Sequence, residues 1–242
     1  MDLSRRRIVL SGGTSGIGRE LAKLLAPDNH VIVLARPSSR SRQLAADIPG
    51  IEIMDADLAD PGSVAAAGQE LAGGEPLDGL INCAAVQNRP LVAAPDFDPA
   101  GLVPEIAVNL TAPCLLTAYL LPGLLRRDRA FIMNVNSGLG LVPKTESAVY
   151  CGTKGGLNIF TLALRNQLAG TPVRVQQAFL PLVETPMTAG RDGAMLAARD
   201  VAGQIISSIR QGTPDTDIGK VRWLRRINRL SPSLARHIMR GT

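Results

Sequence analysis

Tyr150 and Lys154 have side chains that can modify each other's acidity, and they are spaced i, i+4 at the start of a predicted helix. That spacing places both side chains on one helix face. A free phenol, with a pKa near ~10, is too weakly acidic for proton transfer at neutral pH, but a neighbouring ammonium stabilises the phenolate. The pair therefore predicts acid–base chemistry on an oxygen atom. The alternative is a tyrosine that merely packs against a lysine stem.

Two polar residues earlier in the chain fit the same chemistry. Ser137 lies just past a predicted strand, where its hydroxyl can bind a substrate oxygen as charge develops there. Asn109 lies inside a long predicted helix, with Pro113 four residues further on. Because proline lacks an N–H, we expect the Asn109 carbonyl to stay free to hold a water molecule.

A glycine-rich turn joins the first predicted strand to the first predicted helix. Glycines there let a helix N-terminus approach a pyrophosphate closely, so the turn indicates a dinucleotide site. An ordinary glycine-rich turn is the alternative, and the placement between strand and helix favours the phosphate site. The residues expected to line it are Gly12, Thr14, Ser15, Gly16, Ile17 and Gly18.

The end of the second predicted strand indicates which dinucleotide is bound. An acid at this point would bind a ribose 2′-hydroxyl, whereas this chain has Arg36, followed by Ser38, Ser39 and Arg40. Arginine holds a phosphate bidentately and serines can donate to it, so the sequence favours NADP(H). A solvated surface arginine is the alternative.

Small and polar residues follow the next two strands. Asp57 and Leu58 lie where a carboxylate can accept from the adenine amino group. Asn82 and Ala84 end the fourth strand, where small residues allow a cofactor to lie close to the sheet edge. Each signal is weak alone, since Asp57 can be a turn residue and Asn82 a strand cap.

The hydrophobic pattern predicts an α/β fold. Short runs that are apolar on both faces alternate with amphipathic helices, which is typical of a doubly wound parallel sheet with helices on both faces. Predicted strands cover 8–10, 31–34, 51–54, 77–82, 131–135 and 173–180; predicted helices cover 17–25, 43–47, 60–71, 102–125 and 149–168; 190–198 is expected to be a mobile loop.

Composition limits the remaining possibilities. The chain has 242 residues, of which 45% are hydrophobic and 19% charged, so we expect a single globular domain. It has only two histidines, and its three cysteines form no CxxC, so we expect no metal site. We expect the cysteines to be free thiols in a reducing compartment. No signal-peptide apolar region follows the basic N-terminus, which favours a cytoplasmic location.

These motifs together resemble the classical short-chain dehydrogenase/reductase family over roughly residues 5–190. The resemblance implies a Rossmann-type sheet, with Tyr150 as general acid/base and Ser137 polarising the carbonyl. It also implies that Lys154 contacts the nicotinamide ribose and lowers the tyrosine pKa, and that Asn109 holds a relay water. Residues that the family's pattern adds to the cofactor site are Pro181, Val183 and Thr185, with Tyr150 and Lys154 contacting the cofactor as well.

The chain departs from the family pattern in three places. Asn-Asn-Ala-Gly is replaced by Asn-Cys-Ala-Ala at 82–85, Pro-Gly by Pro181-Leu182, and the final glycine-ended strand is reduced to a remnant near 217–219. In the last respect it looks like the bacterial branch named after teichoic-acid D-alanylation. The helices after the fourth and fifth strands commonly form a family dimer interface, so a homodimer is expected. The residues proposed for it are Leu115, Leu116, Tyr119, Leu120, Leu157, Phe160, Leu164 and Leu168.

The C-terminal segment 219–242 differs in charge from the catalytic domain predicted for 1–218. The whole chain carries +5, and this segment has seven basic residues and no acid. An apolar stripe with Val221, Leu224, Ile227 and Leu230 runs between its arginines, with Trp223 beside it. Basic amphipathic helices can bind an anionic membrane surface, but packing over the cleft or a partner subunit is the favoured alternative.

Three functions fit the sequence. The first and favoured one is a reductase of ketones or aldehydes, or the reverse dehydrogenase, because all four of Asn109, Ser137, Tyr150 and Lys154 are present. The second is an NADP(H)-binding regulatory or scaffold protein of the same fold. The third is a membrane-associated enzyme anchored by its tail. The substrate cannot be derived, since its pocket residues are not diagnostic.

Overall fold

A computed structural model describes residues 1–88 and 91–240. Its main sheet has the strand order β3-β2-β1-β4-β5-β6-β9, and every neighbouring pair is parallel. The strands are β1 Arg7–Ser11, β2 His30–Ala35, β3 Ile51–Asp55, β4 Gly79–Asn82, β5 Ala130–Ser137, β6 Val173–Leu180 and β9 Asp215–Asp217. The predicted parallel sheet is therefore confirmed.

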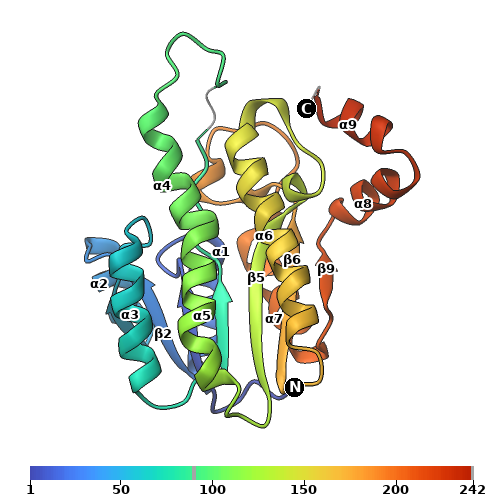
Figure 1. The fold of residues 1–242 in the computed structure, drawn as a ribbon. Coiled ribbons are helices and arrows are strands. Elements are labelled where there is room, and N and C mark those ends of the chain that lie inside the picture. The colour runs from blue at the N-terminus through green and yellow to red at the C-terminus, as the bar shows by residue number, and fades with distance from the viewer. Residues whose placement is uncertain (89–90, 241–242) are drawn as a thin grey trace.

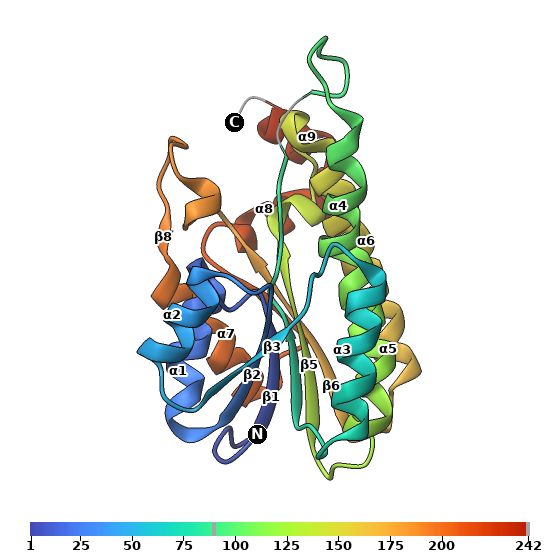
Figure 2. The same cartoon turned by 90° about the vertical axis from the view of Figure 1, so that its left-hand side faces the viewer.

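Helices cover both faces of this sheet. Figure 2 shows α1, α2 and α7 on one side and α3, α5 and α6 on the other, the arrangement of a doubly wound Rossmann-type fold. The helices are α1 Gly16–Leu25, α2 Ser39–Asp47, α3 Pro61–Gly73, α4 Leu102–Ile106, α5 Ala112–Leu124, α6 Ala148–Gln167, α7 Ala198–Gln211, α8 Val221–Leu230 and α9 Pro232–Arg240. Helix α7 was not predicted from the sequence.

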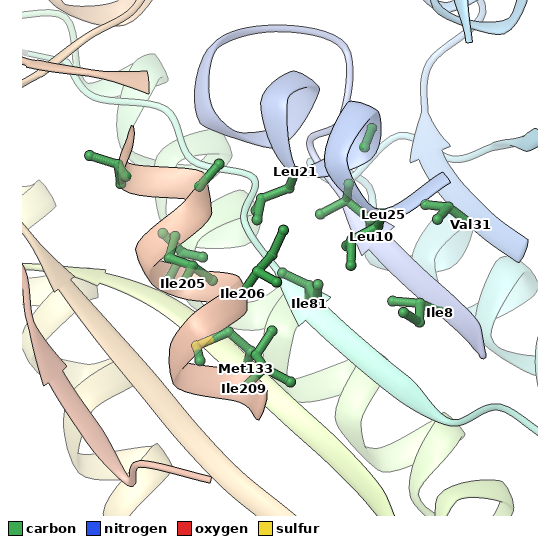
Figure 3. Close-up of a cluster of buried hydrophobic side chains, with 14 of the residues drawn as sticks. Ile8, Leu10, Leu21, Leu25, Val31, Ile81, Met133, Ile205, Ile206 and Ile209 are labelled. Carbon is green, nitrogen blue, oxygen red and sulfur yellow. The ribbon is translucent and has the colours of Figure 1, made fainter. Parts of the chain in front are cut away.

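Each helix layer buries its own apolar cluster against the sheet. In Figure 3, Leu21 of α1 and Ile205, Ile206 and Ile209 of α7 lie over the strands that carry Ile81 and Met133. The opposite face is covered by α3, α5 and α6, which supply a second cluster. Strands buried on both faces explain why the strand runs lack hydrophobic–polar alternation.

The long predicted helix at 102–125 is interrupted by a π-helical turn. Residues Ala107–Thr111 form this turn, in which the N–H of Ala112 donates to the carbonyl of Ala107, five residues back. Asn109 lies at its centre. Because Pro113 has no N–H, it cannot donate a hydrogen bond to the backbone carbonyl of Asn109. The water expected at that carbonyl stays a prediction.

The same stretch, Pro99–Leu124, is the one helix among residues 1–88 and 91–240 with the length and composition of a membrane span. Half of its most apolar window is buried within the fold. Leu116 and Leu120 lie there in the core cluster with α3. Core helices commonly satisfy the same test.

Two predictions near the chain's end need correction. The last strand is Asp215–Asp217, not 217–219, and it pairs with Gln177–Phe179 of β6. The segment expected to be a loop at 190–198 contains a short strand, β8 Leu196–Ala197, which pairs with β7 Val183–Glu184. Strands of two residues are too short to show a hydrophobic periodicity, so β7 and β8 could not be predicted from the sequence.

The C-terminal segment forms two helices beyond β9 (Figure 1). Val221 is buried, and its side chain with that of Leu224 lies against Gly138, just after β5. Arg225 makes two hydrogen bonds to Asp217. The expected break at Ser231-Pro232 is confirmed, although α9 begins at Pro232 rather than Leu234. Residues 241–242 of this segment lie outside the described residues.

Candidate active site

Ser137, Tyr150 and Lys154 meet beside the carboxyl end of β5. Ser137 is the last residue of β5, and the two other residues lie in the first two turns of α6. The hydroxyl of Ser137 accepts from the N–H of Leu139 at 3.1 Å and hydrogen-bonds with Tyr150. The three predicted catalytic side chains are thus brought together by one strand and the helix that follows it.

The Tyr150 phenol is buried. Burial raises its pKa to about 12, while the hydrogen bond with Ser137 and the positive charge of Arg191 act in the opposite direction. A phenol with this pKa is protonated at neutral pH. It can therefore donate a proton to a developing alkoxide, and it needs added positive charge to act as a base.

Lys154 supplies positive charge near the Tyr150 ring. Its ammonium nitrogen lies 5.9 Å from the centre of the Tyr150 ring and donates to the carbonyl of Val135 at 2.9 Å. Burial lowers the pKa of this amine to about 8. Lys154 is therefore held in place by β5, and its charge is sensitive to pH just above neutrality.

The Asn109 side chain makes three hydrogen bonds within the protein. Its side chain accepts from the N–H of Val86 at 2.9 Å and donates to the Val86 carbonyl at 2.8 Å. It also donates to the hydroxyl of Thr153 at 3.2 Å. Its amide thus joins the segment after β4 to α6.

The glycine turn forms a cradle between β1 and α1. Gly12 has φ of +78°, and a Cβ added there would lie 2.6 Å from Cα of Ala84. A Cβ at Gly18 would lie 2.1 Å from the Gly12 carbonyl oxygen. Thr14, Ser15 and Ile17 fill the rest of the turn, and no side chain caps α1. The open helix N-terminus with this close backbone packing fits a pyrophosphate.

Segments from the other end of the sheet close over this cradle. A Cβ at Gly16 would meet the side chain of Thr185 at 3.0 Å, so Thr185 lies over the turn. Pro181 and Val183 lead from β6 to Thr185. On the other side, the buried Asn82 side chain donates to the Asn134 side-chain oxygen at 2.8 Å. The side-chain oxygen of Asn82 has no hydrogen-bond partner in the described residues. The cofactor residues predicted from both halves of the chain thus lie at one edge of the sheet.

The residues predicted to determine which cofactor binds lie just after strands β2 and β3. Arg36 is exposed and directly follows β2. Ser38 caps α2, accepting from the N–H of Ser41 at 3.1 Å, and its donation to a phosphate stays a prediction. Asp57 accepts from the N–H of Ala59 at 3.0 Å, and Leu58 lies half-buried beside it.

Four polar residues beside the site were not predicted from the sequence: Gln87, Glu105, Ser147 and Arg191. Arg191 donates to Gln87 at 2.9 Å, and Gln87 donates to the hydroxyl of Ser147 at 2.8 Å. Glu105 is buried, accepts from the N–H of Asn88 at 3.1 Å, and has a pKa raised by burial. These contacts join residues up to 104 apart in the chain, so no local pattern could have indicated them.

Comparisons with known proteins agree with this geometry. The oxidoreductase DltE of Bacillus subtilis, described as uncharacterized, is 30% identical over 233 residues, covering 93% of this chain and 92% of its own. L-xylulose reductase of Bos taurus is 33% identical over 188 residues, covering 76% of this chain and 75% of its own.

A solved structure shares the whole fold. A short chain dehydrogenase from Burkholderia cenocepacia in complex with NADP superposes with a TM-score of 0.88 at 20% identity, covering 99% of each chain. The short chain dehydrogenase family matches residues 6–195. That range includes the glycine cradle and the Ser137, Tyr150 and Lys154 cluster, and the chain belongs to the short-chain dehydrogenase/reductase family of oxidoreductases.

Proposed function

We propose that the protein is an NADP(H)-dependent reductase or dehydrogenase acting on a carbonyl or alcohol group. The observation that carries this is the convergence of Ser137 and Lys154 on the Tyr150 phenol. When bound, the nicotinamide cofactor supplies or accepts the hydride. The protein's part is to hold the reacting oxygen, to move its proton and to exclude water.

The protein residues divide that work. The Ser137 hydroxyl binds the substrate oxygen, and the Tyr150 phenol gives it a proton in reduction or takes one in oxidation. Lys154 stabilises the phenolate left after proton donation. Asn109 positions the segment after β4 through Val86, and its backbone carbonyl would hold the relay water.

The cofactor residues would act from three segments. The turn at Gly12–Gly18 would hold the pyrophosphate, Thr185 would close over it, and Arg36 would pair with a 2′-phosphate. Asp57 and Leu58 would flank the adenine. Support for NADP(H) comes from exposed Arg36 at the end of β2, and from two similar folds solved with this cofactor, the Burkholderia protein and one from Sphingobium yanoikuyae with NADPH.

A substrate panel tests the activity. Purified protein is mixed with NADPH and carbonyl compounds, or NADP and alcohols, and the nicotinamide absorbance is followed. The panel includes ketoses and 3-oxoacyl thioesters, because relatives are named L-xylulose reductase and 3-oxoacyl-[acyl-carrier-protein] reductase. Tyr150→Phe should lower kcat by ~10²–10⁴ while cofactor still binds.

The chain provides a matched control for this variant. Its other tyrosine, Tyr119, packs on Gly68 of α3 and is remote from the cluster. Tyr119→Phe makes the same chemical change and should leave kcat near the unmutated value. Equal turnover in both variants would contradict the role of Tyr150, whereas tight NADPH binding with no turnover on any substrate would favour the regulatory alternative.

We further propose a homodimer through α5 and α6, with a correction to the residues expected to form it. Leu116, Leu120, Leu157, Leu164 and Leu168 are buried in the core of one chain. The exposed apolar side chains near these helices are instead Val103, Ile106, Ile159 and Leu162. Ile159→Glu should convert the dimer to a monomer in light scattering, and a monomer before mutation would contradict the proposal.

Packing is the role proposed for the start of the C-terminal segment, because Val221 is buried beside Gly138. The segment also has an outer side, where Trp223 is 59% and Leu230 88% exposed. Weak attachment of this side to an anionic membrane is the alternative that vesicle binding would reveal. The cytoplasmic location stays a prediction.

A further inference from the structure

Three hydrogen-bonded residues bridge the mouth of the active site. Arg191 follows β7 and the short turn Pro186–Thr188, Gln87 follows β4, and Ser147 directly precedes α6. The guanidinium of Arg191 donates to the Gln87 side-chain oxygen at 2.9 Å and to the Met187 carbonyl at 3.0 Å. The Gln87 amide then donates to the Ser147 hydroxyl at 2.8 Å.

The middle of this bridge is itself held firmly. Its neighbours Val86 and Asn88 are bound by Asn109 and by the buried carboxylate of Glu105. Ser147 is buried three residues before Tyr150. The Arg191 guanidinium is therefore fixed relative to the first turn of α6, which carries Tyr150.

We propose that Arg191 is a positioning residue: its hydrogen bond to Gln87 holds the segment after β7 against the start of α6 and keeps the guanidinium charge close to Tyr150. The inference rests on the proposed acid–base role of Tyr150. It adds the guanidinium to the Lys154 ammonium as a second positive charge that acts on the phenol. Loss of the bridge would then change the chemistry as well as the shape of the substrate pocket.

The titratable groups that influence the phenol come from three elements. Arg191 acts from the segment after β7, Glu105 from α4, and Lys154 and Cys151 from α6. The positive charge of Arg191 lowers the Tyr150 pKa, whereas Cys151 and Glu105 raise it. Because a cation favours the phenolate, removing the guanidinium must move the phenol's titration to higher pH.

The titration of Tyr150 can be measured directly. The chain has two tyrosines, so Tyr119→Phe leaves Tyr150 as the single phenol. In this background, loaded with NADP, the tyrosinate absorbance is followed against pH. Arg191→Gln should shift the midpoint to higher pH, because a neighbouring positive charge favours the phenolate.

Two further variants separate the charge from the bridge. Arg191→Lys keeps the charge but loses the forked geometry, so it should restore only part of the shift. Gln87→Ala keeps the arginine but removes its anchor, and it should also raise the midpoint. The control is Arg199→Gln, which removes an exposed arginine at the start of α7 and should leave the midpoint unchanged.

The outcomes distinguish this inference from the proposed function. An unchanged midpoint in Arg191→Gln, with turnover still lost in Tyr150→Phe, overturns the role of Arg191 alone. Full turnover in Tyr150→Phe overturns the acid–base assignment, whatever the midpoint does. An equal shift in Arg199→Gln would show a general effect of net charge and would also overturn the inference.

Discussion

Lys154 donates from its ammonium nitrogen to the carbonyl of Val135 at 2.9 Å, which ties α6 to β5 two residues before Ser137. The bond fixes the distance between the lysine and the phenol. The same position buries the Lys154 amine, and burial lowers the pKa of this amine from the ordinary 10.5 to about 8. Position and protonation of this group are therefore coupled.

This coupling predicts a pH dependence of stability. Between pH 8 and 10.5 the unfolded chain holds the lysine proton while the folded chain has lost it. The unfolded state then binds more protons, so the lysine's contribution to the free energy of unfolding rises with pH across that window. Below about pH 8 the penalty for burying the charge is fully present.

Lys154→Met checks this sign, because it keeps the length of the side chain and removes the amine. Denaturant unfolding is measured from pH 7 to 10.5, and the unmutated free energy of unfolding should gain on that of the variant as pH rises. A difference that is constant with pH would contradict the buried titration. The variant should also oxidise alcohols more slowly, since the phenolate loses a stabilising cation.

Arg36 is predicted to decide the cofactor. Charged hydrogen bonds contribute ~1.5–3 kcal/mol, or about tenfold to a hundredfold in affinity. Arg36→Ala should weaken NADPH binding by that factor in calorimetry and leave NADH nearly unchanged. The control is Arg126→Ala, an exposed arginine just after α5. Equal affinity of the unmutated protein for both cofactors would contradict the assignment.

Gly12 is predicted to tolerate no side chain. Its φ of +78° and the 2.6 Å approach of an added Cβ to the Ala84 backbone both oppose Gly12→Ala, which should lower the melting temperature and weaken NADPH binding.

Gly203 in α7 provides the contrast, because an added Cβ would meet nothing within 4 Å. Gly203→Ala should stabilise the helix by ~0.5–1 kcal/mol. If both variants bind NADPH equally well, the cradle is not the cofactor site.

Most helices and strands could be predicted because helix caps and hydrophobic runs depend on residues that are close in sequence. Asp60 accepts from the N–H of Gly62 at the start of α3, as expected for an aspartate before proline. The apolar runs of β1 and β2 are buried on both faces, so their pattern indicated strands clearly. Ser137, Tyr150 and Lys154 come together because β5 and α6 are consecutive, and Asn109 reaches α6 from the π-helical turn through its bond to Thr153.

What sequence could not give depends on contacts between distant segments. Arg191, Gln87 and Ser147 are unremarkable residues until the fold joins them. The cap that Ser38 forms on α2 was not predicted, although a serine before a helix commonly has this role. The dimer residues were chosen for hydrophobicity, which does not distinguish a side chain that faces the core from one that faces outward.

The last prediction concerns the C-terminal segment, whose two sides should behave differently. Val221 is 2% exposed and lies against Gly138, beside Ser137, whereas Leu230 is 88% exposed. Val221→Ala removes two buried methyl-sized groups and should lower the free energy of unfolding by about 1.5–3 kcal/mol. Leu230→Ala should change it by less than ~0.5 kcal/mol.

Deleting residues 219–242 separates packing from membrane attachment. If packing dominates, the truncated chain loses activity and unfolds more easily, because Gly138 loses its cover and Asp217 loses its two hydrogen bonds from Arg225. A stable and active truncated chain would contradict that role. Sedimentation of the full chain with anionic vesicles at low salt, lost in Leu230→Ala or on truncation, would instead assign the exposed apolar and basic side to a membrane surface, since each basic residue there contributes about 1 kcal/mol.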